Sequence, residues 1–153
     1  MATTQNTYTG NGSTTQYAFT FPYLDIADVK VSVDGVDVTA FTYSSATSIN
    51  FNTAPASGAA IRIYRSTSSD QLNKEFYSGS TIRAQDLNDN ALQLLYVTQE
   101  SADIVAAAES AVVDVSTAVS TSTSALNAAN SAISTANSAT TTANSAVTTA
   151  NGA

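Results

Sequence analysis

The sequence has no cysteine, no histidine and no tryptophan in 153 residues. Without cysteine, a disulfide framework and a thiolate metal site are both excluded. Without histidine, the chain lacks the commonest general base and metal ligand of proteins. Serine and threonine are abundant, but a nucleophile needs a base, and no Gly-x-Ser-x-Gly elbow is present. We therefore expect no enzymatic activity, no metal site and no cofactor.

Positive charge is also scarce, with five basic against 12 acidic residues and a net charge of −7. An acidic surface repels phosphate, which argues against a nucleic-acid partner. The first residues, M-A-T-T-Q-N-T-Y, lack the basic and apolar regions of a secretory signal. No stretch approaches the ~20 apolar residues of a membrane span. We expect a chain that is made in a cytoplasm and does not insert into a membrane.

The residues that are present divide the chain in two. All 12 aromatic residues lie at or before Tyr96, all five basic residues lie at or before Arg83, and no charge follows Asp114. This distribution predicts a β-rich domain over residues 1–83 and a helical shaft over residues 84–153. A domain of that size buries only about 60–65% of its unfolded surface, so it would gain stability from oligomerising.

The first part alternates between apolar and polar residues with a period of two over residues 8–64, which is typical of β-strands. Tyr17, Phe19 and Phe21 fall on one face of a strand that ends at Pro22. Further strands are predicted around residues 41–43, 49–51 and 61–63, the last two joined by a turn at residues 55–58. Four to six short strands with frequent turns predict a small antiparallel sandwich or barrel.

One hairpin can be predicted in detail. Asp34-Gly35 stands between two alternating valine runs and favours a two-residue type I′ turn, in which both residues have positive φ. Such a turn would set Val33 opposite Val36, and Val31 opposite Val38, on one buried face. Residues 66–83 then lose the alternation and predict an ordered loop.

The second part has a helical period from about Ala84, with Asp86 and Asp89 in the first turn, where the helix dipole favours acids. No proline follows Pro55 and no glycine lies between Gly79 and Gly152, so one helix can run to the end. From Ala129 onward a phrase beginning A-N-S-A recurs every seven residues. A period of seven is how a helix keeps one seam turned toward a partner helix.

The seam can be written in heptads with an aliphatic residue at nearly every a position. These residues are Val105, Val112, Val119, Leu126, Ile133 and Val147, with Thr140 interrupting the series. The d positions carry small residues, and alanine recurs at g from Ala111 to Ala146, which widens the apolar stripe. A wider stripe suits three helices better than two. The sequence therefore predicts a coiled-coil, trimeric shaft.

Several polar groups allow a chemical and a structural interpretation. Carboxylates between Asp25 and Asp37 could form an acid–base pair, but they are better explained by turns and a solvated strand face. The run from Asp86 to Asn90 resembles a calcium loop, yet Ala91 stands where that loop needs glycine. A helix start explains this run better.

Four of the five basic residues gather between residues 62 and 83, namely Arg62, Arg65, Lys74 and Arg83. They can form a docking patch for an acidic partner surface. They can equally pair within the chain, with Asp70, Glu75 or Asp86. Aromatic residues of the strands are expected in the core, whereas Phe76 and Tyr77 lie in the predicted loop, where exposed aromatics tend to make contacts.

Four phrases in order resemble a known family. They are Y-T-G-N-G-S-T-T-Q-Y-A-F-T-F-P-Y-L (residues 8–24), V-K-V-S-V-D-G-V (29–36), I-R-I-Y-R-S-T (61–67) and F-Y-S-G-S-T-I-R-A-Q-D-L-N (76–88). They resemble the N-terminal domain of the tail fibres of short-tailed, T7-like phages, over about residues 7–100. Beyond residue 100 only the repetitive shaft character is similar.

The resemblance implies a structural protein of the virion, made in the host cytoplasm. Such fibres are homotrimers whose N-terminal domains attach them to the tail at its adaptor, nozzle and portal. On this chain the β domain would be the anchor, and the expected partner-interface residues are Arg62, Arg65, Phe76, Tyr77 and Arg83. The chain ends within a repeat, so we expect the receptor-binding tip in a continuation of the fibre or in a separate protein.

Other functions remain open at this point. The β domain could itself bind host-surface glycans as an adhesin module. A fibre-borne polysaccharide lyase or hydrolase would need acid–base groups that the chain does not obviously supply. An ice-binding use of the alanine–threonine repeat would leave the aliphatic residues at the a positions unexplained.

Overall fold

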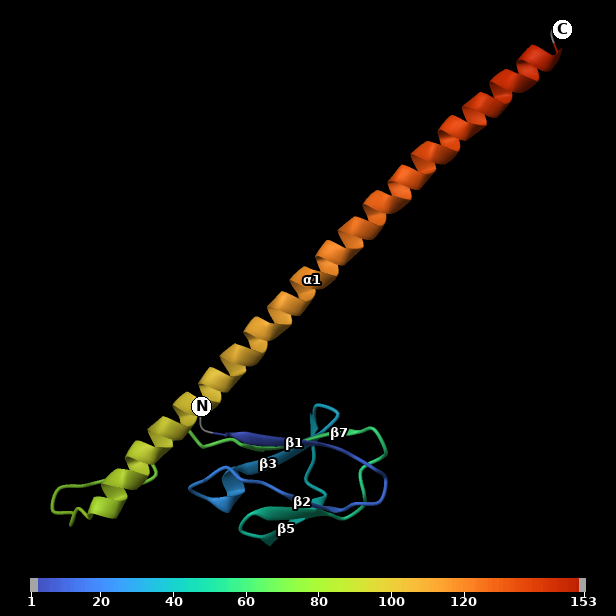
Figure 1. Ribbon diagram of the computed structural model, residues 1–153. Helices are drawn as coiled ribbons and strands as arrows, with labels where there is room; N and C mark the ends of the chain where they lie inside the picture. Colours follow the sequence, from blue (N-terminus) through green and yellow to red (C-terminus); the bar gives the residue numbers. More distant parts are fainter. Residues whose placement is uncertain (1–2, 152–153) are drawn as a thin grey trace. The chain divides into compact units, whose positions relative to one another are not determined.

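The computed structural model describes residues 3–151 as two small antiparallel sheets, an irregular loop and a long helix (Figure 1). The first sheet has the order β1 (Gln5–Thr9), β7 (Ala60–Arg65), β3 (Val29–Val33) and β4 (Val36–Asp37). The second has the order β2 (Gln16–Ala18), β6 (Ser48–Phe51) and β5 (Phe41–Ser45). A short 3-10 helix, η1 (Ile26–Asp28), precedes β3. The predicted antiparallel β region is confirmed.

The number of strands is larger than the predicted four to six, because seven are present among the described residues. The additional strand is β1, an edge strand with weak alternation. It carries the polar sequence Q-N-T-Y-T. A short, polar edge strand leaves little periodic signal in the sequence.

The Asp34-Gly35 hairpin forms as predicted. Asp34 has φ 52° and Gly35 has φ 80°, the positive values that a type I′ turn requires. Val33 lies opposite Val36 across this turn. The prediction that both face the core is wrong for Val36, which is 68% exposed. β4 is an edge strand with a neighbour on one side only, so Val36 remains uncovered.

The prediction that the strands at 49–51 and 61–63 form one hairpin is also wrong. β6 pairs with β2 and β5, whereas β7 pairs with β1 and β3, so residues 55–58 carry the chain from one sheet to the other. Gly10 packs tightly against this crossing, because a Cβ at Gly10 would collide with the carbonyl oxygen of Ala56. The Gly10 amide donates to the Ala59 carbonyl at 2.8 Å.

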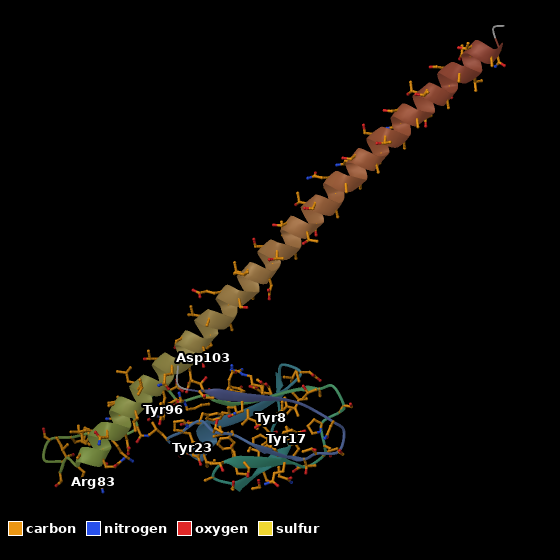
Figure 2. All side chains as sticks on the ribbon, viewed as in Figure 1. Tyr8, Tyr17, Tyr23, Arg83, Tyr96 and Asp103 are labelled. Atoms are coloured by element: carbon orange, nitrogen blue, oxygen red, sulfur yellow. The ribbon has the colours of Figure 1, made fainter. Side chains whose placement is uncertain are left out.

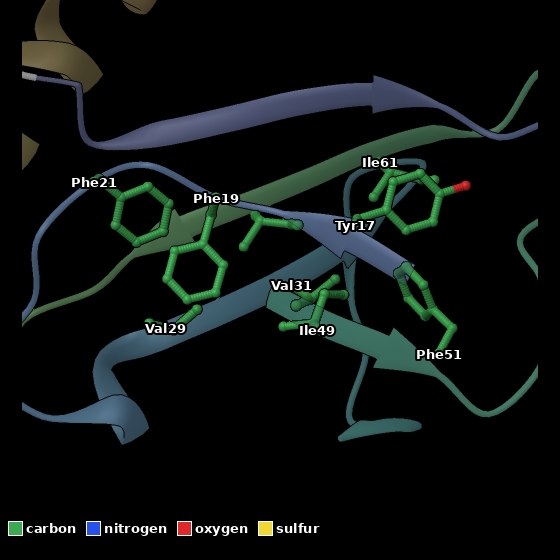
Figure 3. Close-up of a cluster of buried hydrophobic side chains, with 9 residues drawn as sticks. Tyr17, Phe19, Phe21, Val29, Val31, Ile49, Phe51 and Ile61 are labelled. Atoms are coloured by element: carbon green, nitrogen blue, oxygen red, sulfur yellow. The ribbon is translucent and has the colours of Figure 1, made fainter. Parts of the chain in front are cut away.

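The hydrophobic core lies between the two sheets (Figure 3). It contains Tyr17, Phe19, Phe21, Val29, Val31, Ile49, Phe51, Ile61 and Ile63. The rings of Phe19 and Phe21 stack with centroids 5.0 Å apart. Although β2 ends at Ala18, the predicted shared face of residues 17, 19 and 21 is confirmed, since all three side chains are buried. Their aromatic rings bury a large apolar area in the core.

The helix α1 runs from Ala84 to Asn151 and begins where the sequence predicted. Its first backbone hydrogen bonds go from the amides of Asp86 and Leu87 to the carbonyl of Arg83. Contacts divide the chain into two compact units after Val105, so the first part of α1 belongs with the sheets. The division of the chain into residues 1–83 and 84–153 stays a prediction.

The predicted seam residues on the later part of α1 are uncovered in the single chain. Val105, Val112, Val119, Leu126, Ile133 and Val147 are all more than half exposed. Serine and threonine hydroxyls on the same helix donate to carbonyls one turn back, as Thr117 does to Val113 at 3.0 Å. By length and composition alone, one stretch of α1 is apolar enough to cross a membrane.

Candidate partner interface and strand–helix clamp

Arg65 joins the end of β7 to the first part of α1. Its side chain is buried and its guanidinium is 3.7 Å from the centroid of the Tyr96 ring. The nitrogens donate to Glu100 Oε1 (Nε, 2.7 Å), the Pro22 carbonyl (Nη1, 2.9 Å) and Gln99 Oε1 (Nη2, 2.9 Å). A buried guanidinium needs such partners, because an unpaired charge in the interior is strongly unfavourable.

The carboxylate of Glu100 also has several hydrogen-bond donors around it. Besides the ion pair with Arg65, it accepts from the Thr67 amide at Oε2 (3.0 Å) and from the Thr67 hydroxyl at Oε1 (2.7 Å). One turn further along α1, Asp103 accepts a hydrogen bond from the hydroxyl of Thr4. Figure 2 labels Tyr96 and Asp103, two of the α1 residues in these contacts. Strand β7, Thr4 and α1 are therefore held together by partly buried polar contacts.

The side chain of Gln93 anchors the loop that leads from β7 to α1. Its amide nitrogen donates to the carbonyls of Ser68 and Gln71, both at 2.7 Å, and its oxygen accepts from the Asn73 amide at 2.8 Å. The loop has no secondary structure to pair its backbone groups, so a glutamine on the helix pairs them instead.

Asn90 repeats this arrangement one turn earlier. It accepts from the Lys74 amide and donates to the Lys74 carbonyl, both at 2.8 Å. We call this set of α1 residues the clamp: Asn90, Gln93, Tyr96, Gln99, Glu100 and Asp103. Because they recur every three or four residues, they occupy one side of the helix.

Arg62 lies on the solvent-facing side of β7. Its Nε donates to Gln5 Oε1, and its guanidinium lies 4.0 Å from the centroid of the Tyr64 ring. The Tyr64 hydroxyl donates to Asp37 at 2.7 Å. Burial and this carboxylate raise the pKa of Tyr64 to about 12. Arg62 has no ion pair within residues 3–151, so its charge is available to a partner.

Phe76 and Tyr77 lie in the loop, as predicted. Phe76 is half-buried, and Tyr77 is 71% exposed. A turn closes from the Ser80 amide to the Tyr77 carbonyl at 2.9 Å, and Gly79 at its third position has φ 86°, which a type II turn requires. The Tyr77 hydroxyl donates to Glu75, which raises the tyrosine's pKa.

Arg83 stands immediately before α1 with an exposed side chain. Its Nε and Nη2 each donate to one oxygen of Asp86 at 3.0 Å. This forked pair lowers the pKa of Asp86, and the adjacent helix N-terminus favours the same charge.

Residues Asp86 to Asn90 lie in the first turns of α1. Within residues 3–151, no His, Cys, Asp or Glu side chains gather in a metal-binding group.

The structure therefore separates the predicted interface residues. Arg62 and Arg65 lie on opposite faces of β7, whereas Phe76, Tyr77 and Arg83 belong to one segment. The burial of Arg65 could have been predicted from the sequence, because residues 61, 63 and 65 lie on the same face of the strand. The partner of Arg65, Glu100, was not predicted. The sequence feature that could have predicted it is the spacing of the polar clamp residues, which places Glu100 on the side of the helix away from the heptad seam.

The comparison with known families accounts for this combination of elements. The profile described as Phage T7 tail fibre protein, N-terminal domain, matches residues 1–118. The chain belongs to this family. The match confirms the resemblance seen in the sequence, and it covers both sheets, the loop and the clamp of this tail-fibre domain.

Individual relatives of this tail-fibre domain are phage proteins. It is 37% identical over 78 residues to the "Anchor protein" of Klebsiella phage KP34, covering 51% of this chain and 25% of the relative. It is 33% identical over 107 residues to the "Tail fiber protein" of Escherichia phage T7, covering 64% and 19%. It is 30% identical over 97 residues to the "Depolymerase, capsule KN4-specific" of Klebsiella phage KN4-1, covering 59% and 11%. The chain spans a quarter or less of the length of these relatives.

Proposed function

We propose that this chain attaches a tail fibre or anchor protein to the phage tail, as a structural component of the virion without enzymatic activity. The observation that carries the proposal is the family match over residues 1–118. It is supported by a relative whose name is "Anchor protein" and which aligns with half of this chain. The proposed partners are the adaptor, nozzle and portal proteins of the tail.

The attachment surface consists of the exposed members of the predicted set. Arg62 offers a guanidinium without an ion pair, and Tyr77 offers a largely exposed ring at the loop turn. Phe76 and Arg83 flank that turn in the same segment. Exposed tyrosine and arginine side chains are the types that contribute most to protein interfaces. Arg65 is not part of this surface, because its guanidinium is buried and fully paired; it supports the surface from within.

The active form is a homotrimer held by the heptad seam of α1. The proposal is supported by the exposed aliphatic residues at the a positions, since a stripe of that length is unfavourable in water. Alanine at d and g allows close approach of the helices. In such a trimer the apolar side of α1 is buried against the other two helices and not in a membrane. The serine and threonine side chains on the other sides of the helix stay exposed to water.

Binding to tails tests the attachment function. The 153-residue chain should bind purified tails that lack their fibres, and it should not bind host cells. Tyr77→Ala should weaken tail binding about tenfold or more, as for an interface anchor. Ser78→Ala, in the same turn, is the matched control and should bind normally. Binding to cells or capsular polysaccharide, with no binding to tails, would contradict the proposal in favour of a glycan-binding module.

Sedimentation tests the association. The chain should sediment with three times its 15.7 kDa mass at micromolar concentration. Val119→Asp places a charge at an a position and should convert the trimer to monomer. Thr117→Asp places the same charge on the outer side of the helix and should leave the mass unchanged. A monomeric wild-type chain would refute the trimer without affecting the attachment test.

A further inference from the structure

The heptad register of the seam continues upstream of Val105, into the unit that contains the sheets. In this register Leu87 and Leu94 occupy d positions, and Ala91 and Thr98 occupy a positions. Leu87 is 52% and Leu94 is 70% exposed, so the fold of the single chain leaves this side of the helix open. The apolar face thus begins in the first turns of α1.

All clamp residues except Asn90 lie on the opposite side of the same helix. Gln93 and Glu100 occupy c positions, and Tyr96 and Asp103 occupy f positions. In a heptad the b, c and f positions point away from the a and d seam. The sheets and the loop therefore dock on the outer side of α1 and leave the seam accessible to another helix.

A groove lies at the border between the clamp and the seam. It runs between the loop segment 69–72 and α1, and its apolar walls are Leu72, Leu94 and Val97. Asn90 and Val97, which line it from the helix, both occupy g positions. Leu72 is 62% exposed even though its neighbours Gln71 and Asn73 are anchored to Gln93. The loop thus presents an apolar side chain beside the g column.

The register identifies what can fill this groove. In a parallel coiled coil, an e residue of the neighbouring helix lies beside the g residue of the preceding heptad. The neighbour of Asn90 is then residue 95 of a second chain, which is Leu95 and is 49% exposed. Of the e positions from Asn88 to Asn151, leucine occurs only at 95; the others are Asn, Ala, Glu, Ser or Thr. The single leucine at an e position, Leu95, therefore falls at the level of the helix where Leu72 of the loop lies beside the g positions.

We propose that Leu95 of a second copy of this chain occupies the groove formed by Leu72, Leu94 and Val97. This inference rests on the parallel association proposed above and adds a contact that the helical seam alone does not contain. It makes the loop a part of the subunit interface, with Gln93 fixing the position of Leu72. The three anchor domains would then be locked to one another at the start of the shaft.

Cysteine crosslinking can test this contact directly, because the natural chain contains no cysteine. The full chain carrying Leu72→Cys and Leu95→Cys is treated with a short bis-maleimide, and the products are separated under denaturing conditions. The proposal predicts covalent dimers and trimers. Within one chain the two positions lie on opposite sides of α1, so an internal crosslink is not expected and would not raise the mass.

Two further variants separate the possible outcomes. Leu72→Cys with Leu92→Cys is the matched control, because residue 92 lies at a b position at nearly the same height on the helix; it should give no covalent trimer. Val119→Cys alone reports the seam and should crosslink chains whenever the helices associate in register. Crosslinking through residue 119, without any through residues 72 and 95, would overturn this contact while the trimer stands. A monomer that crosslinks through neither would overturn both.

Discussion

Replacing Arg65 by alanine should strongly destabilise the domain. The substitution removes three hydrogen bonds from charged nitrogens, at 2.7 to 2.9 Å, and the stacking on Tyr96. Breaking a buried ion pair by removing one partner costs about 3–5 kcal/mol. Glu100 keeps its two hydrogen bonds to Thr67, and its side chain is 16% exposed, so it can partly rehydrate. We therefore expect a loss of about 3 kcal/mol in the free energy of unfolding, at the lower end of that range.

Urea unfolding at one fixed protein concentration measures this loss, with near-ultraviolet circular dichroism of the tyrosines as the signal. For a slope of about 1.5 kcal/mol per molar urea, the midpoint should fall by about 2 M. Arg62→Ala is the matched control, because it removes the same residue type from the solvent-facing side of β7; it should change stability by less than about 1 kcal/mol. Arg65→Lys should lie between these values, since lysine keeps the charge but cannot fork to several acceptors. Equal midpoints for Arg65→Ala and Arg62→Ala would refute the clamp.

Two further predictions concern pH. The pKa of Asp86 is lowered from 3.8 by Arg83, so its stabilising contribution is complete above pH 3.8 and is lost as the pH falls through the lower, folded-state value. Acid unfolding followed by far-ultraviolet circular dichroism should therefore begin at a higher pH in Arg83→Ala, and an unchanged acid transition would argue against the pair. The pKa of Tyr64 is raised from 10.0 to about 12, so the contribution of its neutral hydroxyl is complete below pH 10 and is lost as the pH rises toward 12. Absorbance titration should show a step near pH 12 that is lost in Tyr64→Phe and moves to lower pH in Asp37→Asn; a Tyr64→Phe curve with the step near pH 12 intact would contradict the assignment.

The clamp also explains why polar residues occupy a helix that otherwise carries an apolar stripe. The outer side of the first turns of α1 is used within the chain, through Gln93 and Glu100. The seam side is left with leucine and valine side chains that are exposed in the single chain. One side of the helix thus contacts the sheets and the loop, and the other side is proposed to contact other chains.

Features that depend on local periodicity and on local turn chemistry could be predicted from the amino-acid sequence. Asp34-Gly35 specified a hairpin because the type I′ turn needs two residues that tolerate positive φ. Alternation specified that Phe19, Ile49 and Ile63 would be buried, since side chains of a strand point alternately to its two faces. The start of α1 at Ala84 followed from the change of period.

Which elements are neighbours could not be predicted, because it depends on contacts between residues that are distant in the sequence. Alternation states which side of a strand faces inward but does not name the strand beside it, so β6 and β7 could satisfy it in one sheet or in two. The role of Arg65 depended likewise on Glu100, which is distant in sequence and approaches only when α1 docks on the sheets. A charged residue at the end of a strand can face water or close a core. Whether it is exposed or buried depends on whether the fold places an oppositely charged partner beside it, because burial is favourable only where the charge is paired.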